Sequence, residues 1–104
     1  MPDLKAIYQE AFAAFARGEL ETAVEGYRAA IEADPRFALA YQGLAEAYSR
    51  LDRLDEAVET IHKAIEIEPG ESLFHTSLSR FLQRQGRIPE AEAAAAQANQ
   101  LQQS

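Results

Sequence analysis

The segment that decides the fold runs from Ala40 to Pro69 and reads AYQGLAEAYSRLDRLDEAVETIHKAIEIEP. Its apolar residues recur every three or four positions in two blocks, which is the spacing that places them on one face of an α-helix. Asp52 stands in a short polar turn between the blocks, and Pro69 ends the second block because proline lacks the amide hydrogen that a continuing helix needs. The segment therefore predicts two consecutive helices joined by a tight turn.

The same pattern recurs on both sides of this segment with a period of 34 residues. Aligned at that spacing, the chain stacks Gly18, Asp52 and Gly86, then Ala23, Ala57 and Ala91, and finally Pro35 and Pro69. Three windows result, at residues 4–37, 38–71 and 72–104, and each contains two helical segments. We expect a single domain over residues 1–104, with six helices of about 12 to 15 residues each.

The turns inside the windows have a local cause. Gly18 and Gly86 can adopt a positive φ where one helix ends, and Asp52 is a tolerated substitute at the matching position. Pro89 fits only the first turn of a helix and so marks a helix start.

The ends of the windows carry their own signals. The prolines that close the first two windows predict that the second helix of each pair stops near Asp34 and Glu68. Asp3 and Ser72 are the expected N-caps of the helices that open the first and third windows.

Composition restricts the class of protein. Hydrophobic residues make up 47% of the 104 residues, which is enough for a shared core, and good helix formers dominate while strand patterns are missing. The absence of cysteine excludes disulfides and thiolate metal sites. The net charge of −7 argues against nucleic acid, whose phosphates such a surface repels.

No stretch reaches the roughly 18 apolar residues of a membrane span, and the start of the chain has no charged and then apolar leader. We expect a soluble, cytoplasmic protein that does not insert into membranes.

The period resembles that of the tetratricopeptide repeat family. In the middle window the family pattern falls on Tyr41, Leu44, Ala45, Tyr48, Ala57, Ile61, Ala64 and Pro69. In the first window it falls on Ile7, Ala11, Ala23, Tyr27, Ala30 and Pro35. The resemblance implies an all-α fold, a right-handed α-α superhelix or solenoid of three helix-turn-helix units, and a protein-binding scaffold without enzymatic activity or cofactors.

Small residues are expected where helices cross closely. Ala11 and Ala45 in the first helices, opposite the alanine column that includes Ala57, let the backbones approach. Tyr27 and Ile61 should fill the wider spaces between helices.

The third window departs from the pattern. It has His75 in the place of the large aromatic residue, and Leu82, Ala95 and Gln103 at three further pattern positions. Asn99 stands where the earlier windows have isoleucine, as expected of a terminal repeat with a more polar outer face. The run Ala93 to Ala96 still leaves a shallow apolar stripe, through which chains could self-associate.

The resemblance further implies that the first helix of each pair lines a concave face on which ligands lie. Carried over residue by residue, that face consists of Lys5, Tyr8, Gln9, Phe12 and Phe15, of Leu39, Gln42, Gly43, Glu46, Ser49 and Arg50, and of Leu73, Thr76, Ser77, Arg80, Gln83 and Arg84. Its N-terminal end is aromatic and apolar, whereas its C-terminal end is basic. The expected partner is a protein or peptide with apolar and acidic segments.

Two alternatives stay open within this set. Arg80 and Arg84 lie one helical turn apart, where they either grip carboxylates or simply solvate a helix face. Phe12 is the better candidate for ligand contact, whereas Phe15 is expected to pack between helices.

Other functions are disfavoured. Family members that clamp the C-terminal carboxylate of heat-shock chaperones carry Lys, Asn and Arg at positions that here hold Tyr8, Phe12, Gly43, Leu73 and Ser77, so a co-chaperone role is not expected. His62 and Glu66 have the spacing of a metal pair, but no third ligand is evident, and no catalytic motif is present. A scaffold or adaptor is therefore the leading function, and a self-assembling structural module is the alternative.

Overall fold

The computed structural model describes residues 3–103 and contains six α-helices. They are α1 (Leu4–Ala16), α2 (Leu20–Ala33), α3 (Ala38–Arg50), α4 (Leu54–Ile67), α5 (Ser72–Arg84) and α6 (Ile88–Gln103). No strand occurs within these residues. The expectation of an all-α protein with two helices in each window is thus confirmed.

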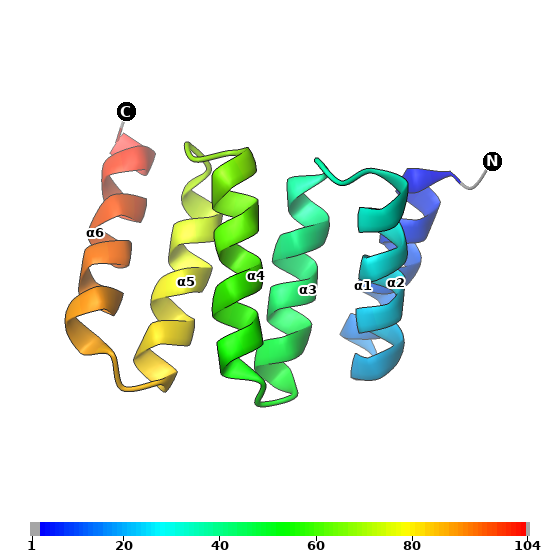
Figure 1. Ribbon diagram of the computed structural model, residues 1–104, viewed down its shortest axis with the longest axis horizontal. Coiled ribbons are helices and arrows are strands. Elements are labelled where there is room, and N and C mark those ends of the chain that lie inside the picture. The colour runs from blue at the N-terminus through cyan, green and yellow to red at the C-terminus, as the bar shows by residue number, and fades with distance from the viewer. Residues whose placement is uncertain (1–2, 104) are drawn as a thin grey trace.

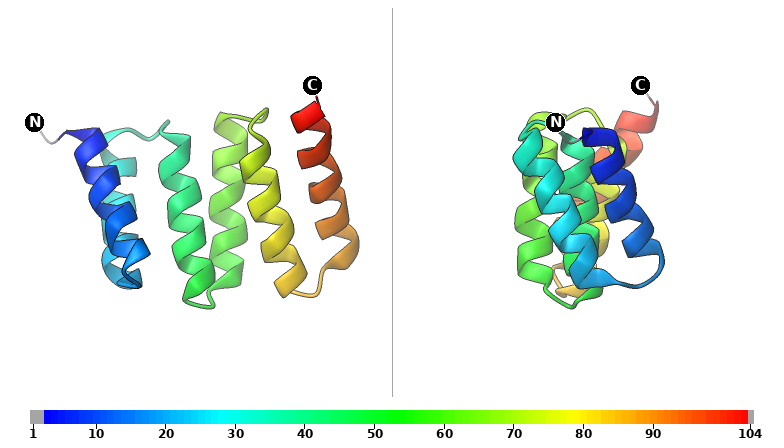
Figure 2. Two further views of the ribbon diagram at one scale, coloured as in Figure 1. Left: turned by 180° about the vertical axis from the view of Figure 1, so that it is seen from behind. Right: turned by 90° about the vertical axis from the view of Figure 1, so that its right-hand side faces the viewer.

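The helices form a solenoid of three stacked pairs that follow one another along the longest of three axes, with extents of 42 × 29 × 19 Å. Each helix packs against its partner in the pair, and the second helix of one pair packs against the first helix of the next. The pair of α1 and α2 lies at one end of the molecule and α6 lies at the other (Figure 1). The view from behind shows the face that carries α1, α3 and α5 (Figure 2).

The turn between the two helices of a pair has the same backbone conformation in all three repeats. Gly18, Asp52 and Gly86 all have positive φ, at 80°, 62° and 78°. In each turn the next amide donates back to a carbonyl of the last helical turn, from Glu19 N to Ala14 O (2.9 Å), from Arg53 N to Tyr48 O (2.8 Å) and from Arg87 N to Leu82 O (2.9 Å). These bonds satisfy carbonyls that the helix end leaves open, which is why a residue that tolerates the left-handed conformation is needed there.

The expected helix ends are confirmed except at one N-cap. The second helices stop at the C-caps Asp34 and Glu68, and the side chain of Asp3 accepts from the amide of Lys5 at 3.1 Å. The prediction for Ser72 is wrong, because this residue is the first of α5 and the N-cap is Glu71. The carboxylate of Glu71 accepts from the amide of Leu73 at 3.2 Å, two residues further on, so the cap lies one position earlier than expected.

Small side chains form the seams between helices, as expected. The alanines of the repeat pattern, among them Ala11, Ala45 and Ala57, are buried. Tyr27 and Ile61 are fully buried between them and fill the larger spaces.

The last helix differs from the expectation in length, since α6 has 16 residues and no proline or glycine stops it. Its buried residues are only Ala91, Ala94 and Ala98, and Asn99 is exposed.

His75 keeps the contact that the aromatic residue makes in the previous repeat. The hydroxyl of Tyr41 donates to the carbonyl of Pro35 at 2.8 Å, and Nε2 of His75 lies 3.0 Å from the carbonyl of Pro69. Since a carbonyl can only accept, His75 donates from Nε2. It is half-buried and connects the linker between two pairs to the first helix of the second pair.

None of the helices within residues 3–103 is both long and apolar enough to cross a membrane.

Candidate binding groove

The inner face, formed by α1, α3 and α5, holds two adjoining pockets. The aromatic pocket has a volume of about 350 Å³ and is lined by Tyr8, Phe12, Phe15, Tyr27, Gln42, Gly43, Glu46, Arg50 and Arg80. The arginine pocket has a volume of about 290 Å³ and is lined by Glu46, Ser49, Arg50, Arg80, Gln83 and Arg84. Because they share Glu46, Arg50 and Arg80, the two pockets form one groove across the three repeats.

The groove brings together most of the residues that the resemblance placed on the concave face. Those that line neither pocket are Lys5, Gln9, Leu39, Leu73, Thr76 and Ser77. Leu39 and Leu73 are nevertheless 40% and 42% exposed at the start of α3 and α5, so they extend the apolar surface of this face.

Aromatic rings form the wall at the N-terminal end of the groove. Phe12 is 55% exposed, which is unusual for so large an apolar side chain. Tyr8 packs between Tyr27 and Phe37, with ring centroids 5.7 Å and 5.2 Å away. Phe15 packs against the core as expected, but its ring also lines the aromatic pocket, so it has both roles.

Tyr27 is a groove residue that sequence reasoning missed, because it was interpreted only as a space-filling residue. It is 1% exposed and reaches the aromatic pocket from α2. Burial, with smaller contributions from Tyr8 and the negative charge of Glu46, raises the pKa of Tyr27 to about 12. Within residues 3–103 its hydroxyl makes no hydrogen bond, and the neutral tyrosine lines the pocket.

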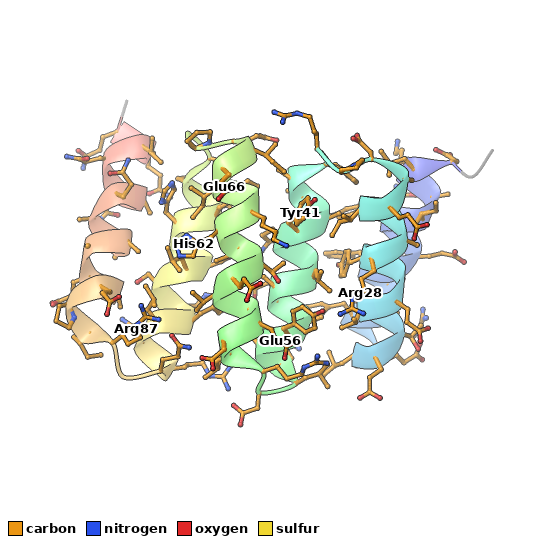
Figure 3. The ribbon with its side chains drawn as sticks, viewed as in Figure 1. Arg28, Tyr41, Glu56, His62, Glu66 and Arg87 are labelled. Carbon is orange, nitrogen blue, oxygen red and sulfur yellow. The ribbon has the colours of Figure 1, made fainter. Side chains whose placement is uncertain are left out.

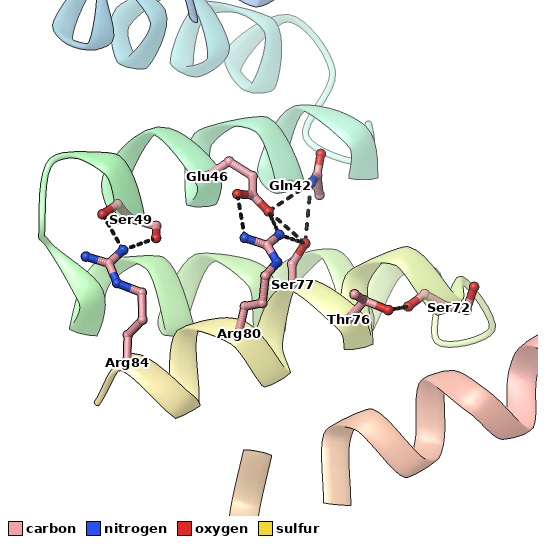
Figure 4. Close-up of polar contacts among 8 residues, drawn as sticks. All are labelled: Gln42, Glu46, Ser49, Ser72, Thr76, Ser77, Arg80 and Arg84. Carbon is pink, nitrogen blue, oxygen red and sulfur yellow. Dashed lines mark hydrogen bonds and ion pairs between the residues drawn. The ribbon is translucent and has the colours of Figure 1, made fainter. Parts of the chain in front are cut away.

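Glu46 organises the centre of the groove (Figure 4). Its carboxylate accepts from the hydroxyl of Ser77 at 2.9 Å and from Nε2 of Gln42 at 3.3 Å. Arg80 donates to both of its oxygens, at 2.5 Å and 3.3 Å. The bonds of Glu46 with Ser77 and Arg80 join α3 to α5, and the carboxylate compensates the positive charge of Arg80.

Arg84 makes a second bridge between the same helices (Figure 4). Its Nη1 donates to the carbonyl of Ser49 at 2.8 Å and to the hydroxyl of Ser49 at 2.7 Å, and Nη2 lies 3.2 Å from Asp52. A cation at the last turn of α3 also interacts favourably with the negative end of the helix dipole.

Both interpretations of Arg80 and Arg84 therefore omitted their contacts with α3. The sequence contains an indication of the contact between Arg80 and α3, because Glu46 and Arg80 are one period of 34 residues apart. Residues at equivalent positions of consecutive repeats are neighbours on the inner face, so opposite charges at such positions predict an ion pair.

The surroundings of Arg50 differ from those of Arg80 and Arg84. Its guanidinium lies over the ring of Phe15, 4.7 Å from the centroid, and it forms no ion pair within the described part of the chain. The guanidinium is exposed between the aromatic and arginine pockets, where it is available for an anionic group.

The opposite face is formed by α2 and α4 and carries the two residues with the spacing of a metal pair. His62 and Glu66 project from α4 (Figure 3), but no group of three potential metal ligands occurs in that part of the chain. Tyr48 is held there between two arginines, since Arg28 donates to its hydroxyl and Arg53 lies 4.7 Å from its ring centroid.

Comparison with known families gives two matches, both described as the tetratricopeptide repeat, over residues 14–80 and 72–97. Among curated proteins, no sequence matches this chain.

Solved structures with the same fold include MamA, with a TM-score of 0.91 and 26% identity over 97% of this chain. The translocator chaperone SycD of Yersinia enterocolitica gives a TM-score of 0.92, with 22% identity over 94% of this chain and 74% of its own. The first repeat domain of Spaghetti (RPAP3), bound to the HSP90 peptide SRMEEVD, gives 0.91 with 17% identity, over 94% and 78%. The chain spans 59% of the MamA structure.

Proposed function

Because the chain belongs to the tetratricopeptide repeat family, we propose that it is a non-enzymatic interaction module whose inner groove binds a peptide segment of another protein. The observation that carries the proposal is the composition of the groove: exposed Phe12 and the unpartnered hydroxyl of Tyr27 lie beside Arg50, which has no ion pair in residues 3–103. An apolar wall, a neutral donor and a cation lie within one groove.

The chemistry of the groove indicates what the peptide carries. An apolar or aromatic side chain fits against Phe12 and Tyr8, where its burial removes apolar surface from water. The hydroxyl of Tyr27 can donate to a main-chain carbonyl, and Arg50 can bind a carboxylate. We therefore infer a segment with an apolar anchor next to an acidic residue.

The proposal can be tested by selection from a random peptide library displayed on phage. Peptides recovered on the full chain should be enriched in an apolar residue followed by Asp or Glu. Synthetic versions are then titrated by calorimetry against the wild type, Phe12→Ala and Arg50→Gln. We expect each substitution to weaken binding by about tenfold, which corresponds to 1.4 kcal/mol.

Arg36→Gln is the matched control, since Arg36 is exposed in the linker between α2 and α3 and lines neither pocket. It should bind as the wild type does. Selected peptides whose affinity is indifferent to Phe12 and Arg50 would contradict the proposal.

The HSP90 peptide SRMEEVD is a useful negative probe. The resemblance assigns the carboxylate clamp to positions that here hold Tyr8, Phe12, Gly43, Leu73 and Ser77, and none of these carries a cation. We expect no measurable binding of this peptide in the same calorimeter. Saturable binding that Phe12→Ala abolishes would show that aromatic residues can replace the clamp.

Three further parts of the proposal follow from the sequence. We propose that residues 4–37, 38–71 and 72–104 act as one binding unit, and that it works in the cytoplasm. We also keep self-assembly as a second role. SycD, one of the structural neighbours, is described as a dimer.

A further inference from the structure

A pocket of about 360 Å³ lies on the outer face, between the first and the second helix pair. Its walls come from α2 and α4, and its floor comes from α3. Both α2 and α4 pack on α3, but within residues 3–103 they do not touch each other, so the space between them stays open. Figure 3 shows three of the lining residues, Arg28, Tyr41 and Glu56, on this face. The outer pocket shares no lining residue with the inner groove.

The cations of the outer helices are gathered in this pocket. Acidic side chains outnumber basic ones in α2, α4 and α6, and the only arginine or lysine residues of these helices are Arg28 and Lys63. Both of them line the outer pocket. Neither forms an ion pair within residues 3–103. An otherwise acidic surface therefore places its two available positive charges around one site.

Two neutral hydroxyl groups add to these cations. Arg28 donates to the hydroxyl oxygen of Tyr48, so the hydrogen of that hydroxyl can be donated to a ligand. Thr60 is only 8% exposed, and its hydroxyl makes no hydrogen bond within residues 3–103. The outer pocket thus offers both charged and neutral donors.

Two carboxylates also line the outer pocket, and they differ in their surroundings. Glu56 is bound by Arg53, which donates to both of its oxygens at 2.7 Å and 2.6 Å. These hydrogen bonds chiefly lower the pKa of Glu56, and the charge of Arg28 contributes less. Glu59 is exposed and forms no ion pair in the described part of the chain. With Arg53 included, the site has three cations and two anions, so it still favours a negatively charged ligand.

The two cations lie at opposite ends of the outer pocket. Arg28 is at the end marked by Tyr48, and it is close enough to Glu56, in the first turn of α4, to affect its pKa. Lys63 follows Glu56 by seven residues, which places it about 10 Å further along α4. Leu44, one helical turn before Tyr48, contributes apolar surface to the floor.

The repeat fold itself does not require these donors. The corresponding place one period further on, between α4 and α6, lacks both cations and the threonine. There the register replaces Arg28, Thr60 and Lys63 by His62, Ala94 and Gln97. The helix pairs stack in both places, so the donors are not needed for packing, and ligand binding can account for them.

We propose that the outer pocket binds a small linear dicarboxylate. One carboxylate pairs with Arg28 and accepts from the hydroxyl of Tyr48, and the other pairs with Lys63. The apolar chain between them lies over Leu44 and Ile31, where its burial removes apolar surface from water. The volume of the pocket is within the range of small-molecule sites. Because the inner groove is a separate surface, this site does not depend on peptide binding.

NMR titration of the ¹⁵N-labelled full chain with adipate at neutral pH tests the proposal. The amide signals of Leu44, Thr60 and Lys63 should shift and reach saturation. Hexanoate has the same number of carbon atoms but one carboxylate, so it should bind about fivefold more weakly, as expected when one partly exposed ion pair is lost. Hexane-1,6-diamine has a chain of the same length with a positive charge at each end, and it should not cause saturable shifts at these amides.

Lys63→Gln separates the two contacts. The side chain is exposed and forms no ion pair, so the fold should persist. Adipate should then bind only as well as hexanoate does, because one of its carboxylates has lost its cation. Arg36→Gln removes the same charge from the linker between α2 and α3, and this matched control should keep the advantage of adipate. Glu59→Gln removes a repelling charge and should strengthen adipate binding by about twofold.

An advantage of adipate over hexanoate that is equal in the wild type and in Lys63→Gln would overturn the proposal. So would shifts that are confined to the inner groove, at Phe12 and Arg50, because adipate would then occupy the other face. Saturable shifts of the outer-pocket amides by the diamine would show that the site prefers cations and would also overturn it.

Discussion

The missing side chain at Gly43 sets the distance between the first two repeats. An added Cβ would lie 2.4 Å from Cε1 and Cζ of Tyr27, and this ring is fully buried and cannot move aside. We expect Gly43→Ala to lower the free energy of unfolding by about 1 to 2 kcal/mol, because overpacking outweighs the gain in helix propensity. Urea denaturation measures the change.

Gly70→Ala is the control, since nothing lies within 4 Å of a Cβ at that position and its stability should hardly change. In a Tyr27→Ile background the cost of Gly43→Ala should shrink by at least about 0.5 kcal/mol, because the clash is gone. Equal costs in both backgrounds would show that the ring is not the cause.

Tyr27 also predicts a pH dependence. Its pKa rises from 10.0 in the unfolded chain to about 12 in the folded protein, so below pH 10 both states are neutral and stability is unaffected. Between pH 10 and about 12 the unfolded chain ionises first, and stability should fall by up to about 1.4 kcal/mol per pH unit.

Urea denaturation of the wild type and Tyr27→Phe across this range isolates the effect, because Tyr8 and the other tyrosines are common to both. The stability of the wild type relative to the variant should be constant below pH 10 and decline above it. Parallel curves up to pH 12 would mean that the phenol is not held neutral.

Particular residues show how far the sequence predicts this structure. The repeat register specifies where each residue lies in the helix pair. It therefore predicts the alanine seams, the turns at Gly18 and Gly86 and the exposure of Phe12. It does not predict the N-cap at Glu71, because Glu71 and the neighbouring Ser72 both have side-chain oxygens that can accept from a free amide of the first turn. The contribution of Tyr27 to the groove could not be predicted, because the register indicates the helix face on which a residue lies and not the position of the end of its side chain.

At the scale of helices, Glu46 connects α3 to α5 and neutralises Arg80. Glu46→Gln should reduce stability by about 1 kcal/mol, since the pair with Arg80 is partly exposed to solvent. It should also strengthen binding of acidic peptides, because a carboxylate is removed from the groove and Arg80 is released. Denaturation and calorimetry with the selected peptides measure the two effects.

Glu66→Gln removes the same charge from the outer face of α4 and should change neither quantity. If Glu46→Gln instead weakened the peptides, the carboxylate would be contributing to the ligand contact or to the shape of the groove.

At the scale of the whole molecule, stability should decline from the middle repeat toward both ends. Each pair of helices contacts only the next pair, so a terminal pair is supported on one side. The buried residues of α6 are alanines, and those of α1 are Ala11 and Ala14, whereas α5 buries Phe74 and Phe81.

Hydrogen exchange followed by mass spectrometry, on protein dilute enough to be monomeric, should show α6 and α1 exchanging fastest among the helices and α3 and α4 slowest. Uniform protection along the chain would instead indicate that the three repeats unfold as one cooperative unit.

The stacking of pairs along one 42 Å axis also has a mechanical meaning. Tension applied between the two termini can be taken up by small rotations at every seam, so the chain behaves as a short coil spring rather than as a rigid block. A partner lying across α1, α3 and α5 would tie neighbouring coils together. Binding of a partner would then make the solenoid stiffer under tension, even if no helix changed its shape.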